Sequence, residues 1–141
     1  MKASLAPGLK FEFKYTIPES KTVPYLYPEA TEFQQMPQVL ATGFMVGLIE
    51  WASVDFINRY IDWPQEQTVG TEVKLSHLAA TPPGLTVTVK GELIQVEGRK
   101  LTFAIVADDG VDVISEGTHE RVIINPDKFK ARVQSKLQLK A

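Results

Sequence analysis

A single carboxylate, Glu50, lies within the most apolar stretch of this chain, residues 37–61. Between Val39 and Ile57 the only other polar residues are Thr42, Ser53 and Asp55. The stretch is too long for a strand and has no internal proline, so it predicts a helix over about residues 38–61 that is buried nearly all round. A buried carboxylate is costly unless it has a partner, becomes protonated or faces a cleft. Glu50 is therefore a candidate catalytic residue.

The chain has only two histidines. His77 is in register with Val73 and Leu75 on the face of a predicted strand that lies against the helix. A histidine on an apolar face is often only a core residue, but an imidazole that meets Glu50 would form a pair capable of acid–base catalysis. His119, expected near the end of the sheet, is interpreted as structural.

Thr42 lies near the start of the predicted helix, where a threonine often caps the helix or bonds back to a carbonyl. Thr42 and Glu50 are eight residues apart, which separates them by roughly 80° around the axis and roughly 12 Å along it. A substrate could lie along that side of the helix. The free backbone N–H groups at the helix start could polarise its carbonyl oxygen.

The elements around the helix follow from periodicity. Alternation predicts a half-buried strand over 9–17, and four prolines make residues 18–38 an irregular segment. The apolar side chains of that segment indicate either a loop packed on the core or a lid over a ligand.

Four more strands follow the helix, with a bulge near residues 91–94 and a hairpin turn at Asp109-Gly110. The first of these strands, over 68–79, is predicted to turn Val69, Thr71, Val73, Leu75, His77 and Ala79 inward. A basic segment over 128–140 closes the chain as a surface helix. The pattern is that of one α+β domain over 1–141, a five-stranded, mostly antiparallel sheet wrapped around one helix. An exposed sheet edge favours at least a dimer.

Composition narrows the function. The chain of 141 residues has a net charge of −2 and no cysteine. It shows no basic stripe for nucleic acid, no metal-ligand motif, and no signal peptide or membrane span. We expect a soluble cytoplasmic protein.

Four segments together resemble one family. They are KTVPYLYPE (21–29), ATGFMVGLIEWA (41–52), SHLAATPPGLTVTV (76–89) and GTHERVII (117–124). The chain resembles the fluoroacetyl-CoA thioesterase group of the hot-dog superfamily from about residue 11 to residue 130. The resemblance implies a hot-dog fold and a homodimer, or a higher oligomer, with active sites at the subunit interface.

The resemblance also implies hydrolysis of an acyl-CoA thioester to a free acid and coenzyme A, with no metal or redox cofactor. The family's catalytic residues match Thr42, Glu50 and His77. The implied substrate-binding residues are Val23, Leu26, Phe33 and Met36 in a lid, Gly70 beside the acyl group, and Arg121 for the coenzyme. Where this chain has Met36, the fluoroacetyl-selective pattern has an aromatic residue, so a preference for other short acyl groups is expected.

Several alternatives stay open at this point. Glu50 could attack the thioester or activate water, and Thr42 could orient the reactants or act as the nucleophile. Outside hydrolysis, the alternatives are a non-catalytic module that binds acyl-CoA or a small hydrophobe, and a hot-dog enoyl-CoA hydratase.

Overall fold

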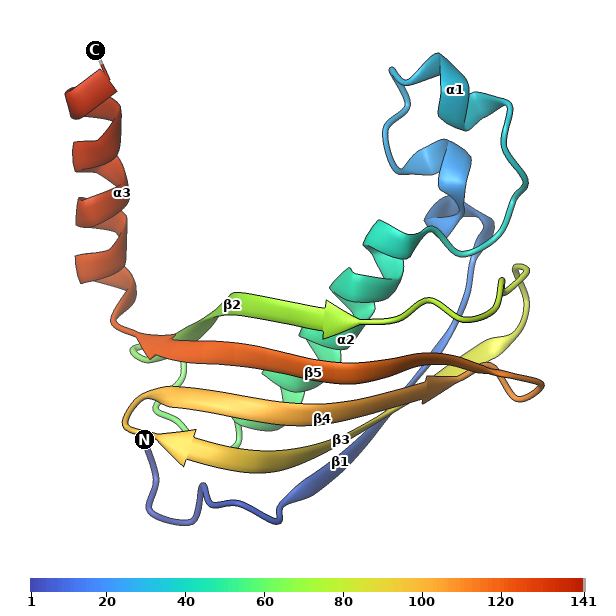
Figure 1. Cartoon of the computed structure of the whole chain (residues 1–141). Helices are drawn as coiled ribbons and strands as arrows, with labels where there is room; N and C mark the ends of the chain where they lie inside the picture. Colours follow the sequence, from blue (N-terminus) through green and yellow to red (C-terminus); the bar gives the residue numbers. More distant parts are fainter. Residues whose placement is uncertain (141) are drawn as a thin grey trace.

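The fold is one curved antiparallel sheet with a long helix against one face (Figure 1). The computed structural model describes residues 1–140. Its strands are β1 (Lys10–Thr16), β2 (Gln67–Leu75), β3 (Thr86–Glu97), β4 (Lys100–Asp108) and β5 (Val113–Ile124), in the spatial order β1-β3-β4-β5-β2. Its α-helices are α1 (Thr31–Gln34), α2 (Thr42–Ile57) and α3 (Pro126–Lys140). The predicted five-stranded α+β architecture is confirmed.

Helix α2 is shorter than the predicted range of 38–61. At its start, Leu40 forms an isolated antiparallel bridge with Thr22, and the amide of Val23 donates to the carbonyl of Val39, so this part of the chain is extended. At its end, the amides of Arg59 and Tyr60 bond three residues back, which tightens the last turn and ends the helix. Thr42 is consequently the first helical residue.

The core lies between α2 and the face of the sheet that it packs against. Every second residue of β4 is buried against the helix, namely Leu101, Phe103, Ile105 and Ala107, as predicted. Phe103 meets Phe56 of α2 edge to face, with ring centroids 6.0 Å apart. The opposite side of α2 is open, because Trp51 is 52% exposed and the Glu50 side chain is 41% exposed. The prediction that this helix is buried nearly all round is therefore wrong.

Bulges set the register of two strands. The one in β3 falls between Leu93 and Gln95, at the end of the predicted range 91–94, and leaves Ile94 exposed. The one in β2 falls between Gly70 and Glu72 and was not predicted.

The β2 bulge changes which side chains face α2. Directly paired residues of antiparallel strands point to the same side of a sheet. Gly70 pairs with Arg121, and after the bulge Val73 pairs with His119. Thr68 and Gly70 thus face the helix, so the predicted inward positions of Val69 and Thr71 are wrong. Strand β2 also ends at Leu75, which places His77 in a loop rather than on the strand.

The irregular segment before α2 is a closed loop above the helix start (Figure 1). Its two ends are joined by the bridge at Thr22 and by the amide of Ala41, which donates to the carbonyl of Lys21. The loop holds the short helix α1 and two 3-10 turns, η1 (Glu19–Lys21) and η2 (Val23–Tyr25). Large apolar side chains on it are exposed, namely Tyr25, Tyr27 and Met36. This segment is not a loop packed on the core.

Helix α3 extends away from the sheet at the end of β5 and buries none of its side chains (Figure 1). No helix among residues 1–140 is both long enough and apolar enough to cross a bilayer.

Candidate active site

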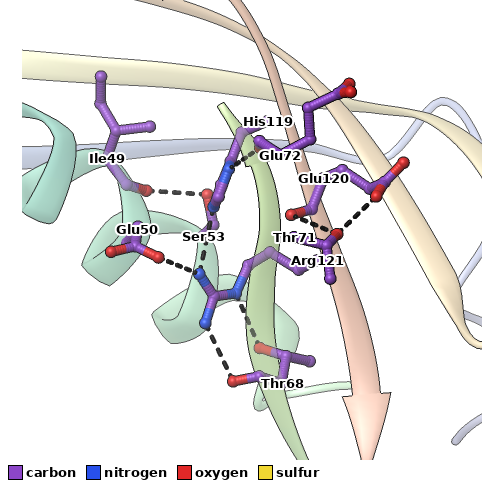
Figure 2. A network of polar contacts seen from close by, with 9 residues as sticks. All are labelled: Ile49, Glu50, Ser53, Thr68, Thr71, Glu72, His119, Glu120 and Arg121. Atoms are coloured by element: carbon purple, nitrogen blue, oxygen red, sulfur yellow. Dashed lines mark hydrogen bonds and ion pairs between the residues drawn. The ribbon is translucent and has the colours of Figure 1, made fainter. Parts of the chain in front are cut away.

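The carboxylate of Glu50 is held by Arg121, not by His77. Glu50 Oε1 accepts a hydrogen bond of 2.9 Å from Arg121 Nη1 across the space between α2 and β5 (Figure 2). The guanidinium side chain is only 6% exposed, whereas the Glu50 side chain is 41% exposed. No residue among 1–140 hydrogen-bonds to Glu50 Oε2. One oxygen of this carboxylate is therefore anchored and the other is available for chemistry.

Arg121 is itself fixed by β2. Its Nε donates to Thr68 Oγ1 at 2.9 Å, and its Nη2 donates to the Thr68 carbonyl oxygen at 3.0 Å. Arg121 was predicted to contact the coenzyme, which stays a prediction. Its burial and its contacts give it a different role in this structure, which is to orient Glu50.

Gly70 leaves the space that this ion pair occupies. A Cβ at position 70 would lie 2.6 Å from Glu50 Oε1 and 3.2 Å from Arg121 Nη1. Both distances are below ordinary van der Waals contact, so any larger residue would displace the carboxylate. Gly70 was predicted to lie beside an acyl group, and the structure places it beside Glu50.

His77 pairs with Thr42. Thr42 Oγ1 and His77 Nδ1 are 2.8 Å apart, and His77 Nε2 is buried without a partner among residues 1–140. Burial lowers the pKa of His77, which favours the neutral ring. With the proton on Nε2, Nδ1 accepts the threonine hydrogen. Thr42 is therefore not the helix cap, a position that Ala41 occupies without any side-chain hydrogen bond.

The start of α2 supplies further donors. The first bond of the helix runs from the amide of Met45 to the carbonyl of Ala41. The preceding amides, those of Gly43 and Phe44 among them, have no acceptor within the helix. They form a cluster of N–H groups beside the Thr42 hydroxyl that suits a carbonyl oxygen.

A buried polar cluster that the sequence did not reveal holds the loop carrying His77. Asp109 Oδ2 accepts from Thr81 Oγ1 at 2.8 Å, and Oδ1 accepts from the amides of Val111 and Asp112. The carbonyl of Thr81 in turn accepts from the amide of Leu40, at 2.8 Å, just before α2. These bonds lower the pKa of Asp109 even though burial alone would raise it. One carboxylate thus ties the His77 loop to the segment that leads into Thr42.

The predicted lid meets the helix at one glycine. A Cβ on Gly43 would lie 3.1 Å from both methyl carbons of Leu26, so Leu26 rests on the bare backbone there. Phe33 of α1 lies near Tyr27, with ring centroids 6.3 Å apart, and Met36 is 46% exposed. The structure brings Val23 and Leu26 to the helix start and leaves Met36 facing outward.

Neither of the two surface hollows near α2 contains both the Thr42–His77 pair and Glu50. His77 lines a shallow one of about 230 Å³ together with Leu78, Ala79 and Ala80. An apolar one of about 170 Å³ lies on the β1 side of α2, between Phe44 and Trp51. Neither is lined by Glu50. The side of α2 that bears Thr42 and Glu50 is instead an open surface.

The chain is similar in sequence to known thioesterases. A family model described as fluoroacetyl-CoA-specific thioesterase matches residues 26–127. A fluoroacetyl-CoA thioesterase from Streptantibioticus cattleyicolor is 51% identical over 136 residues, which cover 96% of this chain and 97% of that protein.

Solved structures share the fold of this chain. A phenylalanine-to-alanine variant of a fluoroacetyl-CoA-specific thioesterase, in complex with fluoroacetate and CoA, superposes with a TM-score of 0.86 at 51% identity. The match covers 89% of this chain and 99% of that one. A hot-dog-like protein from Thermanaerovibrio acidaminovorans gives a TM-score of 0.76 at 20% identity, covering 92% and 91% of the chains, which concerns the fold alone.

The sheet wrapped around one helix, with polar groups on the open side of that helix, defines a hot-dog thioesterase. Within that class, the chain belongs to the family of fluoroacetyl-CoA-specific thioesterases.

Proposed function

We propose that this protein hydrolyses a short-chain acyl-CoA thioester, fluoroacetyl-CoA or acetyl-CoA in type, to the free acid and coenzyme A. The observation that carries the proposal is the Thr42–His77 hydrogen bond at the free start of α2, on the open side of the helix that also bears Glu50. The family, and the relative that acts on fluoroacetyl-CoA, support hydrolysis over a binding module or a hydratase.

The reaction adds the oxygen of water to the thioester carbonyl carbon and breaks the carbon–sulfur bond. Negative charge that builds on the carbonyl oxygen is stabilised by the free amides of Gly43 and Phe44. Glu50 Oε2 accepts the proton of the attacking water, or adds to the carbonyl itself and is released by water afterwards. The departing thiolate takes up a proton and leaves as coenzyme A.

Thr42 and His77 serve the same step at the helix start. A neutral His77 with Nδ1 free accepts the Thr42 proton, which leaves the threonine oxygen able to orient the thioester or to attack it. The 2.8 Å separation suits that proton transfer. Neither route needs a metal or a redox cofactor, and coenzyme A enters only as part of the substrate.

The acyl group lies under the loop that covers the helix start, against Val23, Leu26 and Phe33. Met36 takes the place where the fluoroacetyl-selective pattern has an aromatic residue. A flexible methionine adapts its shape more readily than a phenylalanine, so two- and three-carbon acyl groups are both accepted. A panel of fluoroacetyl-, acetyl-, propionyl- and longer acyl-CoA esters tests this selectivity.

A homodimer completes the site. Strand β2 is at the edge of the sheet, the Glu50 side chain is 41% exposed, and the loop over the helix start exposes Tyr27 and Met36. Pairing two copies along β2 would remove that one of the two sheet edges and cover these groups. Light scattering on the purified protein measures the mass, and a monomer would contradict this arrangement. A cytoplasmic location stays a prediction from the sequence.

The central test replaces Glu50 by glutamine, which keeps the shape and removes the charge. Release of thiol from acetyl-CoA should fall by about 100-fold or more, because no carboxylate oxygen remains to accept a proton. Asp55→Asn is the matched control, since Asp55 is an exposed carboxylate on the same helix whose one ion-pair partner among residues 1–140 is Arg59. Equal rates for Glu50→Gln and the wild type would refute the role of Glu50. If the wild-type protein binds the ester without releasing thiol, it is a binding module instead. If it lowers the enoyl absorbance of an enoyl-CoA without releasing thiol, it is a hydratase.

A further inference from the structure

His119 is a buried histidine that the proposed reaction does not use. It lies in the middle of β5, not near its end as predicted, and is 1% exposed. Its Nδ1 is 2.9 Å from the carbonyl oxygen of Glu72. Because a carbonyl oxygen only accepts hydrogen bonds, Nδ1 must carry a proton and donate it.

The other ring nitrogen faces Arg121. His119 Nε2 is 3.2 Å from Arg121 Nη1, which has hydrogens but no lone pair to offer (Figure 2). Nε2 must therefore accept, and a ring that donates at Nδ1 and accepts at Nε2 is neutral. The contacts with Glu72 and Arg121 therefore select the neutral ring with its proton on Nδ1.

This tautomer fixes the orientation of the Arg121 guanidinium. Nη1 has two hydrogens, of which one goes to His119 Nε2 and the other to Glu50 Oε1. The opposite edge of the guanidinium is held by Thr68. With both edges held in one plane, the second hydrogen of Nη1 can point only toward Glu50.

We infer that His119 is a positioning residue for Glu50, acting through Arg121. The neutral imidazole holds the guanidinium in the orientation that anchors Glu50 Oε1 and leaves Oε2 free. This inference rests on the proposed role of Glu50 in hydrolysis. His119 thus joins Glu50 and Arg121 as a third residue of this hydrogen-bonded group. It lies away from the reacting atoms, and its protonation state sets the position of the Glu50 carboxylate.

Protonation of His119 would undo the arrangement. A hydrogen on Nε2 removes the acceptor and places a second positive charge next to Arg121. Among the charged groups around the ring, Arg121 disfavours the protonated imidazole, whereas Glu50 and Glu120 favour it. The carbonyl of Glu72 also favours the protonated ring, and the Glu72 carboxylate lies near Lys74. Burial is the strongest influence and lowers the pKa of His119, so the neutral ring persists at neutral pH.

The first experiment reads the tautomer directly. With only two histidines in the chain, long-range ¹H–¹⁵N spectra of protein labelled at histidine resolve both rings, and a His119→Gln sample assigns them. At pH 7 the His119 ring should show a protonated Nδ1 and an unprotonated Nε2. An Nε2-protonated or doubly protonated ring at pH 7 would overturn the inference. This measurement does not depend on activity, so it stands even if the wild type releases no thiol and the proposed function fails.

The second experiment compares two substitutions. In His119→Gln the side-chain oxygen can still accept from Arg121, whereas in His119→Leu a side chain of similar size cannot. The leucine variant should lose about tenfold or more in kcat with little change in KM, because the ground-state contacts of the ester are untouched. The glutamine variant should recover most of that loss.

Equal kcat for the two variants, when both melt cooperatively, would show a merely structural role for His119 and refute the inference. If the leucine variant does not fold, the tautomer measurement on the wild type still decides.

Discussion

The contact between Leu26 and Gly43 offers a direct test of how the loop over the helix start packs on α2. Gly43→Ala adds a Cβ that would lie 3.1 Å from both methyl carbons of Leu26, where ordinary contact begins at about 3.4 Å. Leu26 must then shift by a few tenths of an ångström, and the loop shifts with it. Gly47→Ala is the matched control, because it adds the same methyl group one turn later with nothing within 4 Å.

The expected magnitudes differ between the two variants. Alanine is more favourable than glycine inside a helix by about 1 kcal/mol, so Gly47→Ala should raise Tm by about 3–5 °C. In Gly43→Ala the gain is smaller, because Gly43 is in the first turn, and overpacking against Leu26 costs about 1–3 kcal/mol. That variant should range from nearly unchanged to destabilised by about 2–3 kcal/mol.

Activity should separate the variants as well. If the shift of Leu26 removes contact with the acyl group equivalent to one methylene, about 0.8 kcal/mol is lost, or about fourfold in kcat/KM. Thermal melts and thiol release from acetyl- and propionyl-CoA measure both effects. If Gly43→Ala gains as much in Tm as Gly47→Ala and keeps the wild-type kcat/KM, then Leu26 does not rest on Gly43 in solution and the reasoning fails.

Three further predictions follow from the buried polar groups. Gly70→Ala should lower kcat by about tenfold or more with a small change in Tm, because its Cβ would lie 2.6 Å from Glu50 Oε1; unchanged thiol release would place the carboxylate elsewhere. Asp109→Asn should lower the free energy of unfolding by about 1–3 kcal/mol in urea titrations, since a charged acceptor of three hydrogen bonds is lost, and an unchanged midpoint would contradict this. Stability should fall as the pH drops below about 6.5, because the unfolded chain then binds protons at His77 and His119 that the folded chain, with both pKa values lowered, does not; urea midpoints equal at pH 7.5 and 5.5 would contradict it.

The architecture could be predicted from the sequence because periodicity reports burial. Alternation in β4 identified its buried residues, and the broken alternation in β3 located its bulge. The same method failed in β2, where a short strand with a bulge at residues 70–72 reverses the faces of the residues before it. Alternation read through the bulge placed Val69 and Thr71 inward, and it extended the strand over residues that form a loop.

The structure places the candidate catalytic residues Thr42, Glu50 and His77 on or beside α2, but the predicted pairing of Glu50 with His77 is wrong. Glu50 was matched to His77 because both were expected on facing surfaces. Arg121 was available as a partner from the sequence, since it falls in the same inward register of β5. A sequence pattern does not show how far each side chain reaches across the sheet, and Arg121 reaches Glu50 from the second strand in from the edge.

Each polar pair leaves one atom without a partner, and this sets a condition on the function. His77 Nε2 is buried without a partner among residues 1–140. Glu50 Oε2 accepts no hydrogen bond from these residues either, but it belongs to a side chain that is 41% exposed. An unpaired buried polar atom costs about 1–3 kcal/mol, and this cost applies to His77 Nε2. Groups that become paired only when a thioester, a water molecule or a second subunit is present recover that energy on binding. The open side of α2 is therefore better understood as one wall of a site that binding completes than as an exposed surface.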